Sequence, residues 1–140
     1  MHFEVSLIVK VPRDKAYSAY TDFEALPKWS GQKQEIRVAR REGNAVYLEK
    51  VPAGTGRREV REMRLFPPER VESEGETRFA RTRSFVSFED ATGGTKVTAS
   101  LDVQLKGRWG WILRTRGKAD AESSAMDELT SFAKYAEGLP

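Results

Sequence analysis

A chain of 140 residues is long enough to bury the core of one domain, and we predict a single domain over residues 1–140. Its 39% hydrophobic and 32% charged residues exclude an intrinsically disordered chain. No apolar run is long enough to span a bilayer and no signal-peptide pattern opens the chain, so we expect a cytoplasmic protein.

Charge and residue content also restrict the chemistry. The 24 basic and 21 acidic residues leave a net charge of only +3, and we therefore expect no nucleic-acid partner. The absence of cysteine excludes disulfides, thiol catalysis and cysteine-ligated metals. His2, the one histidine, lies at the N-terminus, where it supports neither a catalytic triad nor a histidine-rich metal site. We expect no metal and no cofactor.

The N-terminal part of the chain predicts a strand followed by two short helices. Residues 3–11 alternate apolar and mainly polar side chains, as a strand with one buried face does. Pro12 ends this strand, Asp14 stands at the start of the first helix, and Asp22 is a candidate N-cap for the second. Because Pro27 lies inside the second helix, we expect that helix to be short or irregular.

Six further strands are predicted in the middle of the chain. They cover residues 35–41, 45–51, 57–66, 70–75, 78–89 and 95–106. Turns rich in glycine, asparagine or proline separate most of them: Glu42-Gly43-Asn44, Ala53-Gly54-Thr55-Gly56, Pro67-Pro68 and Ala91-Thr92-Gly93-Gly94. The last strand alternates most clearly, which predicts a half-buried antiparallel strand.

One long helix is predicted at the C-terminus, over residues 118–137. Its apolar residues recur at three- and four-residue steps, the spacing of one helical face: Ala119, Met126, Leu129, Phe132, Ala133 and Ala136. A long helix after a run of strands predicts an α+β layer, in which the helix packs against a curved antiparallel sheet. This geometry leaves room for a pocket between sheet and helix.

Four stretches, spread over nearly the whole chain, carry a resemblance to a known superfamily. They are Val11-Pro12 with Ala16-Tyr17, the segment from Thr21 to Trp29, Gly93-Gly94-Thr95-Lys96-Val97, and Phe132 to Glu137. In order and spacing they resemble the START / Bet v 1-like (SRPBCC) superfamily, in the group of polyketide cyclase/dehydrase and lipid-transport proteins. The resemblance implies a helix-grip fold, with a seven-stranded antiparallel sheet wrapped around the long C-terminal helix and two short helices after the first strand. It also implies an internal cavity for a small apolar molecule; some members are enzymes and many only bind or carry.

Apolar side chains on the inward faces of sheet and helix are candidates for the cavity lining. They are Tyr47, Val51, Met63, Leu65, Phe85, Val97, Leu101, Met126 and Leu129. The alternative is that these residues are ordinary core, since every fold needs an apolar stripe.

Arginines on the strand over residues 57–66 are candidates for polar contacts with a ligand. Side chains of a strand alternate between its two faces, and here both faces hold charged residues. At least one charged residue is therefore expected at the cavity or its mouth, with Arg61 and Arg64 as the candidates. The alternative is an outer face of cross-strand ion pairs. In aromatase/cyclase members an arginine late on this strand contributes to the pocket chemistry, which makes Arg64 a weak catalytic candidate. The strand lacks the aromatic residues that such cyclases carry there.

Residues 107–117 hold apolar side chains between arginines. Trp109 and Trp111, with Ile112 and Leu113, are flanked by Arg108, Arg114 and Arg116. They predict either a lid that contacts ligand through Trp109 and touches an anionic membrane surface, or closure of the core where sheet meets helix.

Three functions follow from these features. The first is a protein that binds or carries a small hydrophobic ligand, lipid-, quinone- or polyketide-like, between sheet and C-terminal helix. The second is an aromatase/cyclase- or dehydrase-type enzyme that uses the same cavity. The third is a protein-interaction module whose cavity is filled by side chains.

Overall fold

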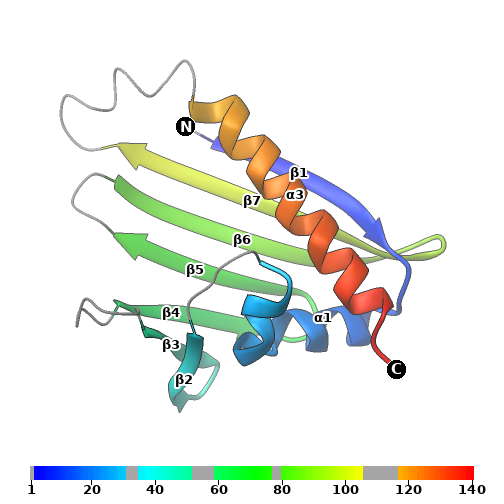
Figure 1. Ribbon diagram of the computed structural model, residues 1–140, viewed down its shortest axis with the longest axis horizontal. Helices are drawn as coiled ribbons and strands as arrows, with labels where there is room; N and C mark the ends of the chain where they lie inside the picture. The colour runs from blue at the N-terminus through cyan, green and yellow to red at the C-terminus, as the bar shows by residue number, and fades with distance from the viewer. Residues whose placement is uncertain (1, 31–34, 52–58, 77–79, 106–116) are drawn as a thin grey trace.

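The structure is a computed structural model that describes residues 2–30, 35–51, 59–76, 80–105 and 117–140 (Figure 1). The elements follow in the order β1 (His2–Val9), α1 (Arg13–Thr21), the 3₁₀-helix η1 (Phe23–Lys28), β2 (Glu35–Glu42), β3 (Ala45–Val51), β4 (Glu59–Phe66), β5 (Arg70–Glu76), β6 (Ala80–Ala91), β7 (Gly94–Leu105) and α3 (Gly117–Glu137). This order confirms the predicted strand, two short helices, six strands and long helix. Among the described residues, no helix has the length and apolarity needed to cross a bilayer.

The strands form one antiparallel sheet, in the order β1-β7-β6-β5-β4-β3-β2. Every pair of neighbours along the sheet is also consecutive in the chain except β1 and β7, so β1 and β2 lie at opposite edges. Helices α1 and η1 carry the chain between these edges, and α3 lies across the concave face, against β1 and α1 (Figure 1). The predicted helix-grip fold is confirmed.

The two short helices begin without side-chain caps. Pro12 precedes α1, where its missing N–H costs nothing, and Asp14 lies in the first turn. Asp22 occupies the N-cap position of η1, but its side chain makes no capping hydrogen bond; its carbonyl accepts the N–H of Ala25 at 3.0 Å instead. Pro27 lies inside η1, which agrees with the expectation of a short, irregular helix.

An aromatic cluster joins α1, β6 and α3 at one end of the concave face. Tyr20 packs edge-on against Phe88, with ring centroids 5.7 Å apart, and against Phe132 at 5.4 Å. Trp29 contacts the Phe132 ring at 5.0 Å, and Tyr17 contacts Phe88 at 5.3 Å. These rings fill the space beneath the C-terminal half of α3 and anchor the helix to the sheet.

The β6–β7 turn fixes the end of β1. Gly94 has a φ of +156°, and a Cβ placed there would lie 2.1 Å from the carbonyl oxygen of Val9. The next residue, Thr95, is fully buried and donates its hydroxyl to the carbonyl of Val11 at 2.8 Å. The turn and β1 therefore fit together only with glycine at position 94.

Candidate functional site on the concave face

Cross-strand register shows which side chains of β4 face the helix. Met63 is 8% exposed and belongs to the same core cluster as Val46 and Leu48. Met63 lies opposite Val46, and Arg61 lies opposite Leu48. Because side chains alternate along a strand, Arg61, Met63 and Leu65 face the concave side, whereas Glu62, Arg64 and Phe66 face the outer side. The sequence left this direction open.

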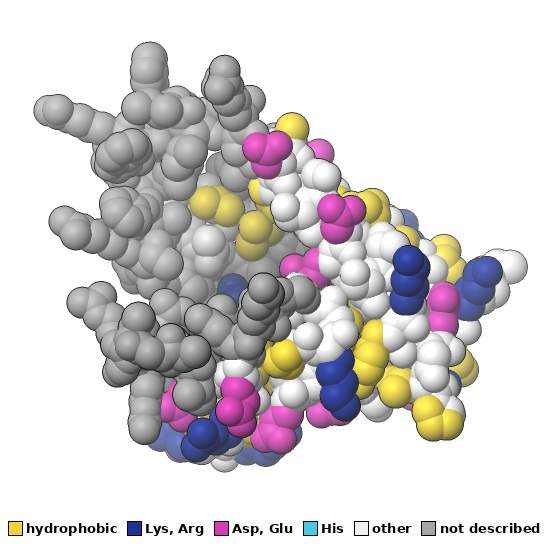
Figure 2. All heavy atoms as spheres, viewed as in Figure 1, with side chains coloured by type: hydrophobic (Ala, Val, Ile, Leu, Met, Phe, Trp, Pro, Cys, Tyr) yellow, Lys and Arg dark blue, Asp and Glu magenta, His cyan; other side chains and the backbone are white. Residues whose placement is uncertain are grey.

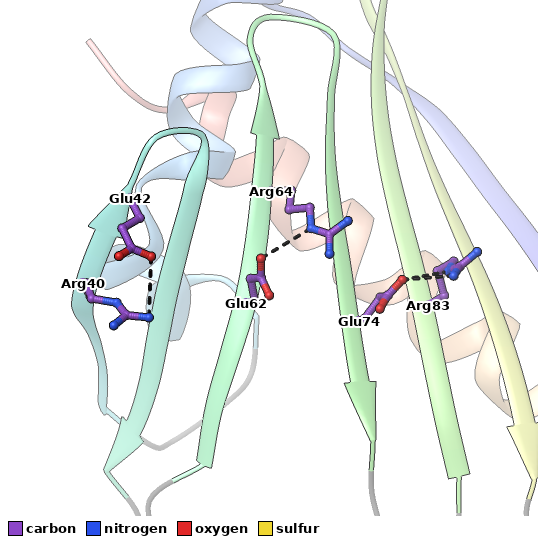
Figure 3. Close-up of polar contacts among 6 residues, drawn as sticks. All are labelled: Arg40, Glu42, Glu62, Arg64, Glu74 and Arg83. Atoms are coloured by element: carbon purple, nitrogen blue, oxygen red, sulfur yellow. Dashed lines mark hydrogen bonds and ion pairs between the residues drawn. The ribbon is translucent and has the colours of Figure 1, made fainter.

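The outer face carries ion pairs between neighbouring side chains (Figure 3). Arg64 Nε lies 3.4 Å from Glu62, Arg83 Nη2 lies 3.0 Å from Glu74, and Arg40 Nη2 lies 3.7 Å from Glu42. These side chains are 40–63% exposed, so each pair stabilises the fold by less than about 1 kcal/mol. A shallow groove of about 250 Å³ on this face includes Arg64, Glu72 and Phe85.

The predicted lining residues divide between the two faces. Met63, Val97, Leu101 and Leu129 lie on the concave side or on the helix that covers it, with Leu65 packed against the core. Tyr47, Arg64 and Phe85 lie on the outer face, where Tyr47 stacks with Arg40, its ring centroid 4.3 Å from the guanidinium carbon. On α3, Leu129 is 5% exposed, but Met126 is 37% exposed. Trp109 lies outside the described residues, and the Val51 side chain is not described either.

The concave face is polar toward the end of β5 and the start of β4 and β6. We call Arg61, Ser73, Gly75, Thr82 and Ser84 the polar floor; they come from β4, β5 and β6. The Ser73 and Ser84 hydroxyls hydrogen-bond to each other across β5 and β6, and Thr82 donates its hydroxyl to the Gly75 carbonyl at 3.3 Å. The four small residues therefore satisfy one another, and they leave Arg61 as the charged member.

Arg61 has unmet hydrogen-bonding capacity. Its Nε atom is buried and has no hydrogen-bond partner among the described residues. A Cβ placed on Gly75 would lie 3.8 Å from Arg61 Nη2 and 3.9 Å from Nε, so the guanidinium passes over the bare backbone of β5. Arg61 is half-buried, but a buried N–H donor without an acceptor still costs stability unless a partner completes its hydrogen bond.

Tyr20 brings a second ionisable group to the same space. Burial raises the pKa of the Tyr20 hydroxyl well above its usual range, the negative charge of Glu128 raises this pKa further, and the positive charge of Arg61 lowers it. These opposing influences place Tyr20 of α1 within electrostatic reach of both β4 and α3. The charges of one guanidinium and one carboxylate therefore both act on the Tyr20 phenol.

The space above the polar floor is open beside α3. Figure 2 shows a hollow there, with hydrophobic and basic atoms visible inside it and acidic side chains over the helix. A recess of about 850 Å³ at the end of the sheet is a different space: it is lined mainly by outer-face residues such as Glu62, Arg83 and Asp102, and only Gly75, Thr82 and Val103 come from the concave side. We use the name hollow for the space beside α3 (Figure 2), and we infer from strand register, in which Leu101 lies opposite Ser84, that the polar floor and Leu101 border it.

Most residues of the polar floor were not predicted from the sequence, although the alternation of side chains along β5 indicates them. In β5 the run from Val71 to Gly75 places Glu72 and Glu74 on one side, which leaves Val71, Ser73 and Gly75 for the buried side. Tyr20 and Glu128 had no such pattern, because their position depends on how α1 and α3 cross the sheet.

Within the ranges that the structure describes, no group of three or more histidine or acidic side chains is placed to hold a metal ion. The ionisable groups at the hollow are Arg61, Tyr20 and Glu128, which suit contacts with an organic molecule.

A curved antiparallel sheet wrapped around one long helix defines the helix-grip class of proteins, and here a partly polar hollow lies between the two. The sequence matches the family described as polyketide cyclase / dehydrase and lipid transport over residues 1–137, and the chain belongs to that family. No functionally curated protein matches the sequence.

Solved structures of the same fold share little sequence with this chain. TTHA0849 from Thermus thermophilus has a TM-score of 0.79 and 20% identity, covering 97% of both chains. The Zhui aromatase/cyclase from a Streptomyces species has a TM-score of 0.78 and 14% identity, covering 98% of this chain and 93% of that one. Ara h 8.0201 has a TM-score of 0.70 and 18% identity, covering 97% of both chains. At these identities the likeness shows the fold alone.

Proposed function

We propose that the protein binds a small hydrophobic ligand in the hollow between the concave face and α3. The observation that carries this proposal is the composition of the hollow. Leu101 lies opposite Ser84 of the polar floor, and Leu129 of α3 belongs to the apolar core; ligand sites typically combine apolar walls with a few placed polar groups. The family description, which includes lipid transport, agrees with such a role. Lipid-, quinone- and polyketide-like molecules all have the required apolar surface.

Binding of a neutral apolar fluorophore tests this proposal. N-phenyl-1-naphthylamine becomes fluorescent in an apolar site, and long-chain alcohols should displace it. Leu101→Trp places a bulky ring in the hollow and should lower the affinity for the dye at least tenfold. Ser100→Trp places the same ring on the opposite face of β7, since neighbouring residues of a strand alternate, and should leave binding unchanged. Absence of dye binding would favour a protein-interaction module with a filled cavity.

A second candidate function is an aromatase/cyclase- or dehydrase-type enzyme in the same hollow. The observation that favours it is the electrostatic influence of a cation, Arg61, and a carboxylate, Glu128, on one buried phenol, Tyr20. A fixed guanidinium stabilises the enolate that forms during aldol cyclisation. Arg64 points away from the hollow, so Arg61 takes its place as the catalytic candidate in this proposal. Arg61→Met should then abolish turnover of a poly-β-ketone substrate, and Arg64→Met should not.

Two further expectations concern the surroundings of the protein. A cytoplasmic location stays a prediction that cell fractionation tests. Contact with an anionic membrane through Trp109 and Trp111 also stays a prediction, because residues 106–116 lie outside the described part of the chain. Co-sedimentation with phosphatidylglycerol vesicles tests it, and replacing both tryptophans by alanine should abolish binding.

A further inference from the structure

We propose, building on the function above, that the ligand is an amphipathic acid whose carboxylate is bound by Arg61. The side chain of Arg61 is the charged group of the polar floor, and its buried Nε lacks a hydrogen-bond partner among the described residues. A guanidinium presents its donors as a planar fork, which matches the two oxygens of a carboxylate. A bound carboxylate supplies the missing acceptor and neutralises the charge.

The glycine at position 75 supports this assignment. Gly75 does not have a positive φ, so the backbone conformation does not require glycine there. A Cβ at this position would lie 3.1 Å from Thr82 Oγ1 and within 4 Å of two Arg61 nitrogens. The missing side chain therefore keeps one flank of the guanidinium clear, where a larger residue on β5 would cover it.

The neighbouring groups do not complete the site. The hydroxyls of Ser73 and Ser84 bond to each other, and the Thr82 hydroxyl donates to Gly75. Glu128 on α3 is the acidic side chain that acts on Tyr20 together with Arg61. The Glu128 side chain is exposed and has an interaction of its own. A guanidinium has five N–H donors, so a single carboxylate beside Arg61 would leave donors for a ligand. A neutral ligand without an acceptor would leave the buried Nε–H of Arg61 unpaired.

The experiment compares decanoic acid with decanol, two ligands that differ in the polar group alone. Dissociation constants are measured at neutral pH by displacement of N-phenyl-1-naphthylamine from the full chain. We expect the wild type to bind the acid about 10- to 100-fold more tightly than the alcohol, the range that one or two charge-assisted hydrogen bonds supply. Arg61→Met should remove this preference and leave the affinity for the alcohol nearly unchanged.

Matched variants make the result specific to Arg61. Arg64→Met removes the same charge from the outer face of the same strand and should keep the full preference. Gly75→Ala retains Arg61 but crowds its flank, and should weaken the acid several-fold with little effect on the alcohol. This second variant keeps the test valid even if Arg61→Met fails to fold.

Several outcomes would overturn the proposal. Equal affinity of the wild type for acid and alcohol, or an acid preference that survives in Arg61→Met, would remove the role of Arg61 while binding in the hollow stands. Failure of both ligands and of the dye to bind would reject the proposed function and, with it, the role of Arg61.

Discussion

Gly94 shows how a single residue positions a whole strand. Its absent side chain lets the β6–β7 turn approach the backbone of β1, where a Cβ would lie 2.1 Å from the Val9 carbonyl oxygen. Gly94→Ala should therefore lower the free energy of unfolding by at least about 2 kcal/mol. Gly43 is the control, because its φ of +57° would strain an alanine backbone, but a Cβ there meets nothing within 4 Å. Gly43→Ala should cost only about 1 kcal/mol in the same urea titration.

Tyr20 predicts a loss of stability at alkaline pH. Burial, followed by the charge of Glu128, raises the pKa of its hydroxyl above the usual value of 10.0. A raised pKa in the folded state means that the neutral phenol contributes stability below the unfolded pKa and that this contribution falls as the pH rises above it. Tyr20→Phe should lose less stability than the wild type as the pH rises above 10.0, the usual phenol pKa. Identical pH profiles for the two proteins would contradict this.

At the scale of elements, α3 contributes one strongly buried turn and one exposed one. Phe132 is 0% exposed and contacts the rings of Tyr20 and Trp29, whereas Met126 is 37% exposed. Phe132→Ala should cost about 3–5 kcal/mol of stability, as large aromatic truncations do. Met126→Ala on the same helix should cost clearly less than Phe132→Ala, because more than a third of the Met126 surface stays exposed to water. Thermal unfolding of both variants checks the difference, and equal losses would contradict the assigned helix face.

The outer face of β4 to β6 should contribute little to stability. Arg83 and Glu74 lie 3.0 Å apart, but their side chains are 59% and 55% exposed. A double-mutant cycle with Arg83→Met and Glu74→Gln should give a coupling energy under about 1 kcal/mol that falls as salt is added. A larger coupling that is insensitive to salt would indicate a desolvated pair.

The sequence alone could not settle which side chains of β4 face the helix and which face outward. Both alternating sets of β4 contain arginine and glutamate, so the usual contrast between an apolar and a polar face is missing. The partner strand β3 settles the orientation of these side chains, because Val46 and Leu48 are buried and lie opposite Met63 and Arg61. In β7, by contrast, alternation was clear, and Val97 and Leu101 lie on the predicted face.

At the scale of the whole molecule, the fold could be predicted because each element carries its own pattern. The one long helix, the glycine turns and the alternating strands together specify an antiparallel sheet around a helix. The hollow could not be predicted in the same way. It depends on how α1 and α3 cross the sheet, which brings Tyr20 and Glu128 to Arg61 from opposite ends of the sequence.

The most direct test of the account is to locate the site on the protein at which a ligand binds. Decanoic acid is titrated into the isotopically labelled full chain, and NMR shifts are recorded for backbone amides and arginine Nε–H groups. The largest shifts are expected at Arg61 Nε–H and at Leu101 and Leu129, which border the hollow. Shifts confined to Arg64 and Phe85 in the outer groove, or no saturable shifts, would contradict the assignment of the hollow as a binding site for amphipathic acids.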